Sequence, residues 1–147
     1  MNLPPTLPFK TIFELSQVKI AVSELSRAQY SSESDFAEAL ASATRAYPAL
    51  TFVAEKITSF DSIIALKKEI AEFEAHTPVA HIWTAYPLKP ELIDRLSSSI
   101  TNHYHQTYLL DIQLESQVLG GIACEINGKY IDKTLKTITK AVIDAYV

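Results

Sequence analysis

Residues able to perform nucleophilic or metal chemistry are few, with one Cys and four His in 147 residues. Cys124 lies in an apolar stretch and faces the core of an expected hairpin, where burial raises a thiol pKa and makes it unreactive. His103 and His105 end an expected helix and do not share a helical face; in an extended segment they would, but no His-Glu-x-x-His pattern accompanies them. We therefore expect no catalytic residue, no metal ligand and no enzyme activity.

The three glycines, Gly120, Gly121 and Gly128, all lie between residues 119 and 135 and invite comparison with a phosphate-binding loop. Such a loop needs glycines that lead into the N-terminus of a helix. Here the first two lead into an apolar, β-branched stretch that predicts a strand, and no Gly-Lys-Ser/Thr follows. No cofactor site is expected, and the glycines are assigned to backbone geometry.

The dipeptide Asn127-Gly128 predicts a β-hairpin, because a type I′ turn needs positive φ at both central residues. Asp132 follows the expected second strand and precedes a helical pattern, where its carboxylate could cap the first turn. A two-residue turn also fixes the register. The expected pairs are Ile126 with Lys129, Glu125 with Tyr130, and Cys124 with Ile131.

The overall composition is that of a folded protein, with 48% hydrophobic residues. A net charge of −4 and the absence of a basic run argue against nucleic-acid binding. No apolar run is as long as a membrane span, so direct membrane insertion is not expected. The single Cys excludes an internal disulfide and suits a reducing compartment.

Residues 1–77 have the pattern of short amphipathic helices. The first is expected from residue 9 to about residue 29, with Phe9, Ile12, Phe13 and Ile20 on one apolar stripe and Val18, Val22 and Leu25 on the next. About four such helices must bury their apolar faces together, which predicts a small all-α bundle. The other stripes are Phe36, Leu40, Ala43 and Tyr47; Leu50, Val53 and Ile57; and, after a Ser59 cap, Ile63, Leu66, Ile70 and Phe73.

Residues 78–147 have a different pattern, and we place a domain boundary near residue 77. Strands are expected over 79–86 and 108–115, separated by a helix that begins at Pro90, and the hairpin and a final helix follow. The order is β-α-β-β-β-α, so the whole chain is predicted to be α+β. The stripe of the first helix is Ile93, Leu96, Ile100 and Tyr104, and that of the last is Leu135, Ile138, Val142 and Tyr146.

Lys133, Lys136 and Lys140 recur at helical spacing in the expected last helix, opposite its apolar stripe. A solvated face is the ordinary interpretation, and a basic edge for an acidic partner helix is the alternative. The apolar stripes of the N-terminal bundle could likewise leave a groove for an amphipathic segment, although such stripes more often pack against one another. Both surfaces are candidates for partner binding.

The glycine stretch resembles the C-terminal signature of the delta subunit of F-type ATP synthases, whose mitochondrial counterpart is the oligomycin-sensitivity-conferring protein. The resemblance extends over about residues 79–145, including the strand over 80–88 with its Pro-Leu ending and the strand over 108–115. The residues of the signature are Leu119, Gly120, Gly121, Gly128, Ile131, Asp132, Thr134 and Leu135.

This resemblance implies a non-catalytic subunit of the peripheral stalk, without a cofactor, at the cytoplasmic face of the membrane. Its implied partners are the N-terminal segments of the alpha subunits and the b subunits, so that the subunit links the catalytic head to the stalk and prevents its rotation. The family's N-terminal domain is a six-helix bundle, whereas residues 9–75 predict about four helices. An E-type stalk subunit of archaeal or vacuolar ATPases and an unrelated protein-binding module are the alternatives.

Overall fold

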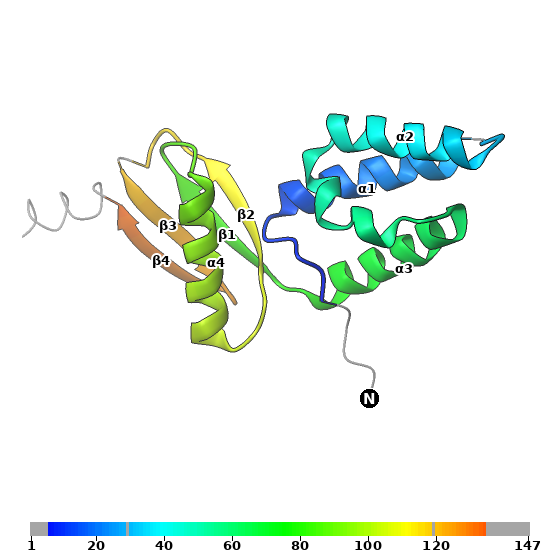
Figure 1. Cartoon of the computed structure of the whole chain (residues 1–147). Helices are drawn as coiled ribbons and strands as arrows, with labels where there is room; N and C mark the ends of the chain where they lie inside the picture. The colour runs from blue at the N-terminus through cyan, green and yellow to red at the C-terminus, as the bar shows by residue number, and fades with distance from the viewer. Residues whose placement is uncertain (1–5, 29, 119, 135–147) are drawn as a thin grey trace, which may run out of the picture. The chain divides into compact units, whose positions relative to one another are not determined.

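The computed structural model describes residues 6–28, 30–118 and 120–134 (Figure 1). The chain divides into two compact units, Met1–Thr77 and Pro78–Val147. The first unit contains helices and the second contains a sheet with one described helix, so the α+β class predicted from the sequence is confirmed.

The first unit is built on three α-helices, α1 (Ile12–Arg27), α2 (Glu33–Ala46) and α3 (Phe60–His76). Helix α1 packs against both α2 and α3 (Figure 1). Each helix begins at a hydroxyl cap, since the side chains of Thr11, Ser32 and Ser59 accept a hydrogen bond from the backbone N–H three residues later. The predicted Ser59 cap is therefore confirmed.

The prediction of a short α-helix around residues 50–57 is wrong. The structure has two 3₁₀ turns there, η1 (Pro48–Phe52) and η2 (Ala54–Lys56), whose backbone bonds span three residues, as from Val53 N–H to the Leu50 carbonyl at 3.1 Å. The two turns together cover only residues 48–56, too short a stretch for a stable α-helix of its own, and Thr51 and Val53 within it are β-branched and poor helix formers. The tight turns still bury the whole expected stripe of Leu50, Val53 and Ile57.

The core of the first unit confirms one expected apolar stripe of the first helix and contradicts much of the other, whose first member, Phe9, is buried but lies before α1 begins. Val18, Val22 and Leu25 are buried, whereas Phe13 is 69% exposed and Ile20 is 49% exposed. Helix α1 packs against α2, α3 and η1 with the side of the helix that carries Val18, Val22 and Leu25, which leaves Phe13 and Ile20 on the solvent side. The stripe of α3 is buried throughout, and its last residue, Phe73, meets Phe9 edge to face with ring centroids 6.3 Å apart.

Helix α2 has an apolar stripe but no fully buried residue. Its members Phe36, Leu40, Ala43 and Tyr47 are only half-buried, so the complete burial expected from the sequence is wrong for this helix. Tyr30 covers one side of the Phe36 ring at a centroid distance of 5.0 Å. The apolar face of α2 is thus incompletely covered within the described part of the bundle.

The second unit is a four-stranded sheet in the order β2-β1-β3-β4. The strands are β1 (Val79–Thr84), β2 (Leu109–Leu114), β3 (Gly121–Ile126) and β4 (Lys129–Thr134). Strands β1 and β2 are parallel and are joined through helix α4 (Pro90–Tyr104), while β3 is antiparallel to both of its neighbours. The first strand ends two residues earlier than expected, at Thr84, where the chain turns toward α4.

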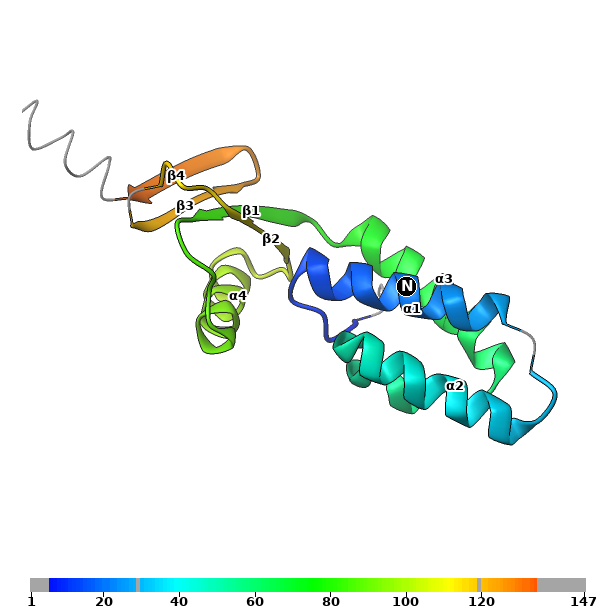
Figure 2. The same ribbon diagram turned by 90° about the horizontal axis from the view of Figure 1, so that it is seen from above.

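Helix α4 covers one face of this sheet, which we call the inner face (Figure 2). The helix packs with its predicted stripe, and the strands contribute alternate residues, as their two-residue period requires. The buried centre consists of Ala80, Ile82, Tyr108, Leu110 and Ile126, and the partly buried residues against it include Ile93, Leu96, Ile100, Tyr104, Ile122 and Cys124.

Candidate partner-binding surfaces

The hairpin between β3 and β4 has the geometry predicted from its turn. Asn127 has φ of 53° and Gly128 has φ of 73°, as a type I′ turn requires. All three expected cross-strand pairs, from Ile126 with Lys129 to Cys124 with Ile131, are present. The Asn127 amide also donates a 2.7 Å hydrogen bond to the Tyr108 hydroxyl, which ties the turn to the residue before β2.

The double glycine acts through its backbone. Gly120 and Gly121 have φ of 69° and 75°, a region that residues with a Cβ seldom adopt. The Gly120 N–H donates to the Val118 carbonyl at 2.9 Å, which closes the turn that leads into β3. These glycines shape the entry to the hairpin and lead into a strand, so no phosphate loop is formed.

Asp132 lies within the second strand of the hairpin and not after it, as the sequence had suggested. Strand β4 continues through Thr134, with Asp132 opposite Ala123 and Thr134 opposite Gly121. The hairpin register pairs every residue of β4 with a residue of β3. Ile131 also lies in β4, and Lys133 belongs to it by its backbone. The remaining predicted residues, Leu119, Leu135, Lys136 and Lys140, and the final helix lie outside the described residues.

Substituting Gly128 with Val is expected to destabilise the second unit by about 1–2 kcal/mol, which lowers its melting temperature by about 5–10 °C. A Cβ at this position would meet nothing within 4 Å, so the cost arises from φ alone, which a β-branched residue tolerates poorly. Thermal unfolding followed by tryptophan emission tests this. Asn tolerates this φ and serves as the control; equal melting temperatures for the Val and Gly forms would contradict the prediction.

Cys124 and two of the four histidines, His76 and His81, have ordinary structural surroundings. Burial raises the pKa of the Cys124 thiol, which disfavours the nucleophilic thiolate, as expected from the sequence. The His81 ring donates from Nδ1 to Asp111 at 2.9 Å, and His76 donates to the Glu72 carbonyl at 2.7 Å. Across the residues that the structure describes, no group of three or more His, Cys, Asp or Glu could hold a metal ion.

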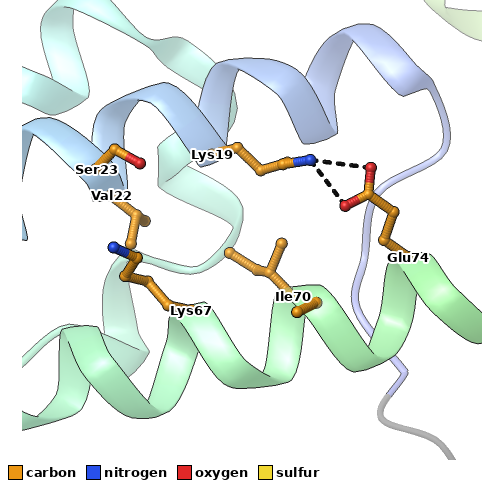
Figure 3. Close-up of a pocket in the computed structure, with 7 residues that line it drawn as sticks. Lys19, Val22, Ser23, Lys67, Ile70 and Glu74 are labelled. Atoms are coloured by element: carbon orange, nitrogen blue, oxygen red, sulfur yellow. Dashed lines mark hydrogen bonds and ion pairs between the residues drawn. The ribbon is translucent and has the colours of Figure 1, made fainter.

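A groove of about 250 Å³ lies between α1 and α3 (Figure 3). Val22 and Ile70 point into it from opposite helices and form an apolar floor. Lys19 spans one end, with its Nζ 2.9 and 2.8 Å from the two carboxylate oxygens of Glu74. The sequence predicted that such a groove was possible but not its position, because the spacing of α1 and α3 is set by tertiary packing. The lining is completed by Ser23, Lys67 and Ala71.

A second cleft, of about 560 Å³, lies along the incompletely covered face of α2. Phe36 and Leu40 line it from α2, and Ile57 and Phe60 line it from the segment that leads into α3. Phe60 is 44% exposed. Both of these depressions are mostly apolar, and both are bordered by polar side chains.

Comparison with known proteins places these features in a family. The family model described as ATP synthase delta (OSCP) subunit matches residues 31–142, which is most of the chain. The chain belongs to the ATP synthase delta (OSCP) subunit family. The resemblance seen in the glycine stretch is thereby confirmed.

Individual relatives of this delta-family chain match over shorter stretches. ATP synthase subunits delta 2 and delta 1 of Syntrophotalea carbinolica are 25% and 24% identical over 83 residues, 56% of this chain and 46% of each relative. ATP synthase subunit delta of Frankia casuarinae is 32% identical over 54 residues, 37% of this chain and 20% of the relative. The matched part of this chain therefore spans slightly less than half the length of each of the first two relatives.

The family match includes both the helical unit from residue 31 onward and the hairpin of the sheet unit. Three α-helices and two 3₁₀ turns are described before residue 77 in this delta-family chain, in place of the predicted four helices. None of the described helices has the length and apolar character needed to cross a bilayer.

Proposed function

We propose that this chain is a non-catalytic subunit of the peripheral stalk of an ion-translocating F-type ATP synthase. It would link the catalytic alpha/beta head to the b subunits and keep the head from turning with the rotor. The observation that carries the proposal is the family match over residues 31–142, which includes the hairpin with its three positive-φ glycines. The subunit would bind at the cytoplasmic face of the membrane as a peripheral component.

The groove between α1 and α3 is the proposed site for an N-terminal segment of an alpha subunit. Its floor of Val22 and Ile70 suits the apolar face of an amphipathic helix, while Lys19, Lys67 and Glu74 at its borders suit the polar flanks. Side chains of both signs at the rim would favour one register of such a helix over others. The function of the groove is binding and not catalysis.

The second unit is the proposed site for the b subunits. A link that resists torque needs buried interface area, since isolated surface ion pairs contribute only about 0–1 kcal/mol each. Lys133, Lys136 and Lys140 are proposed as a separate basic contact for an acidic partner segment, and the signature glycines are proposed to shape the unit without touching a partner.

The stalk function is tested by affinity purification from membranes of the source organism. The tagged chain is expected to retain alpha and b subunits at stoichiometric levels, together with ATP hydrolysis activity contributed by the retained head. Recovery of the chain as a monodisperse monomer, with no ATP synthase subunit beside it, would count against the stalk function and favour a stand-alone binding module.

Filling the groove is expected to weaken binding of the alpha segment by at least about tenfold. Ala71 is exposed and lines the groove, so Ala71→Trp places an indole where the helix would lie without disturbing the core. Calorimetry with a synthetic peptide of the alpha N-terminus measures the effect. Ala65→Trp, at an exposed position of α3 outside the groove, is the matched control. Equal affinities for both variants and the parent chain would exclude the groove as the site.

A further inference from the structure

The sheet of the second unit has a second face, opposite α4, which no described element of that unit covers (Figure 2). Its side chains follow from the register, because they alternate with those that pack under α4. We define the outer face by His81 and Trp83 on β1, Asp111 on β2, Ala123 and Glu125 on β3, and Tyr130 on β4.

Aromatic rings cross the outer face in a row. The His81 and Trp83 rings stack at a centroid distance of 6.2 Å, and the Trp83 and Tyr130 rings are 6.0 Å apart. Ala123, directly opposite Trp83 in the register, is only 1% exposed, whereas Tyr130 is 58% exposed. A solvent-facing aromatic surface on rigid strands is typical of interface centres, since its rings lose little freedom on binding.

The charge of the outer face is acidic. Asp111 and Glu125 lie on it, Asp132 shares it by register, and it carries no Lys or Arg among the described residues. Asp111 is fixed by hydrogen bonds from His81 Nδ1 and from Gln113 Nε2, both at 2.9 Å. Such a surface can bind a Lys or Arg side chain in two ways. The carboxylates form ion pairs with the cation, and the faces of the aromatic rings attract it through cation–π interactions.

We propose that the outer face docks a Lys- or Arg-bearing amphipathic segment of a partner protein. Its apolar residues would pack on Trp83 and Tyr130, and its cations would lie over the rings and beside Asp111 and Glu125. Nucleic acids and anionic lipid surfaces carry the same sign as this face and are disfavoured. The inference rests on the proposed stalk function in one respect, namely that the second unit binds a partner. It adds which surface of this unit is used and which kind of partner segment binds there.

Trp83 is the single tryptophan of the chain, so its emission reports binding at the outer face directly. The probe is a synthetic amphipathic peptide of Leu, Ala and Lys, titrated into the full chain, and its counterpart carries Glu at each Lys position. We expect a saturable change in Trp83 emission with the Lys peptide, weakened by salt, and none with the Glu peptide. Binding measured by calorimetry without a change in emission would place the peptide elsewhere and overturn the proposal.

Charge variants separate the outer face from general attraction to an acidic protein. Asp111→Asn combined with Glu125→Gln is expected to weaken the Lys peptide about tenfold. Glu55→Gln combined with Glu91→Gln makes the same change in net charge at exposed positions that do not belong to this face, and it should bind like the parent. Tyr130→Ala, which removes an exposed ring, is expected to weaken binding independently of charge. Equal weakening by the two charge pairs would overturn the proposal.

Two further outcomes bear on the occupant. Trp83 emission that changes with the concentration of the chain alone would identify a second copy as the occupant and overturn the proposal. Purification from membranes separates a failure of the outer-face proposal from a failure of the stalk function. If the Asp111→Asn, Glu125→Gln variant retains b subunits as the parent does, the outer face is not their docking surface and the stalk function stands; if it retains alpha but loses b, the proposal is supported.

Discussion

Replacing Phe73 with Ala is expected to reduce the free energy of unfolding of the helical unit by about 3–5 kcal/mol. Phe73 is 2% exposed and meets Phe9, also 2% exposed, edge to face. Removing the ring forfeits its apolar burial, its aromatic contact and the packing of the residues around the void. Because small domains are stable by only about 5–15 kcal/mol, a large share of the helical signal should be lost near physiological temperature.

Phe13→Ala is the matched control, since it removes the same atoms from α1. Phe13 is 69% exposed, so its loss should change the free energy of unfolding by no more than about 0.5 kcal/mol. Urea unfolding of each full-length variant, followed by far-ultraviolet circular dichroism, measures both values. Similar losses for the two variants would mean that the packing of α1 and α3 differs from the one described.

The contrast between these phenylalanines shows where sequence reasoning succeeds and where it stops. The stripe of α3 recurs over the whole length of the helix, so its burial could be predicted, although Phe60 and Ile64 beside it are exposed. In α1 two apolar stripes are adjacent, and periodicity cannot decide which of them faces the neighbours. The incomplete burial of Phe36 and Leu40 could not be predicted either, because it depends on how many helices are present to cover α2.

The hairpin was predicted in detail because its determinants are local. Asn127-Gly128 fixes the turn, and the turn fixes the register of the adjoining strands. The end of the second strand was placed too early, before Asp132, for the complementary reason. The side chain of an Asp favours a helix cap when only the chain near it is considered, whereas pairing with Ala123 on the neighbouring strand decides its conformation in the sheet.

Neither candidate surface could be located from the sequence alone. The outer face depends on the strand order, because Trp83 lies beside Ala123 only when β3 pairs with β1. Asp111 joins the same face because β2 runs parallel to β1 on its other side. The groove between α1 and α3 likewise brings Val22 and Ile70 together across a long stretch of chain. The residue types were visible, but their meeting is a property of the tertiary fold.

The sheet unit should be most sensitive at Leu110, where substitution by Ala is expected to cost about 2–5 kcal/mol in the free energy of unfolding. Leu110 is 0% exposed and lies in the core under α4, opposite Ala80 in the register. In a unit of this size such a loss corresponds to a fall in melting temperature of at least about 10 °C. Trp83 emission follows the unfolding of this unit specifically, because the single tryptophan lies in β1.

Leu114→Ala makes the same chemical change at the other end of β2. It is the control that shows whether the burial of a leucine or its place in the sequence pattern decides the loss of stability. The alternation of β2 assigns Leu110 and Leu114 to one face, and by pattern alone they should be equivalent. In the structure Leu114 is 62% exposed, because burial declines along β2 toward its end. Its loss should therefore cost less than about 1 kcal/mol. Equal losses at the two positions would show that a further element covers the end of β2, and the extent of the inner face would then have to be redrawn.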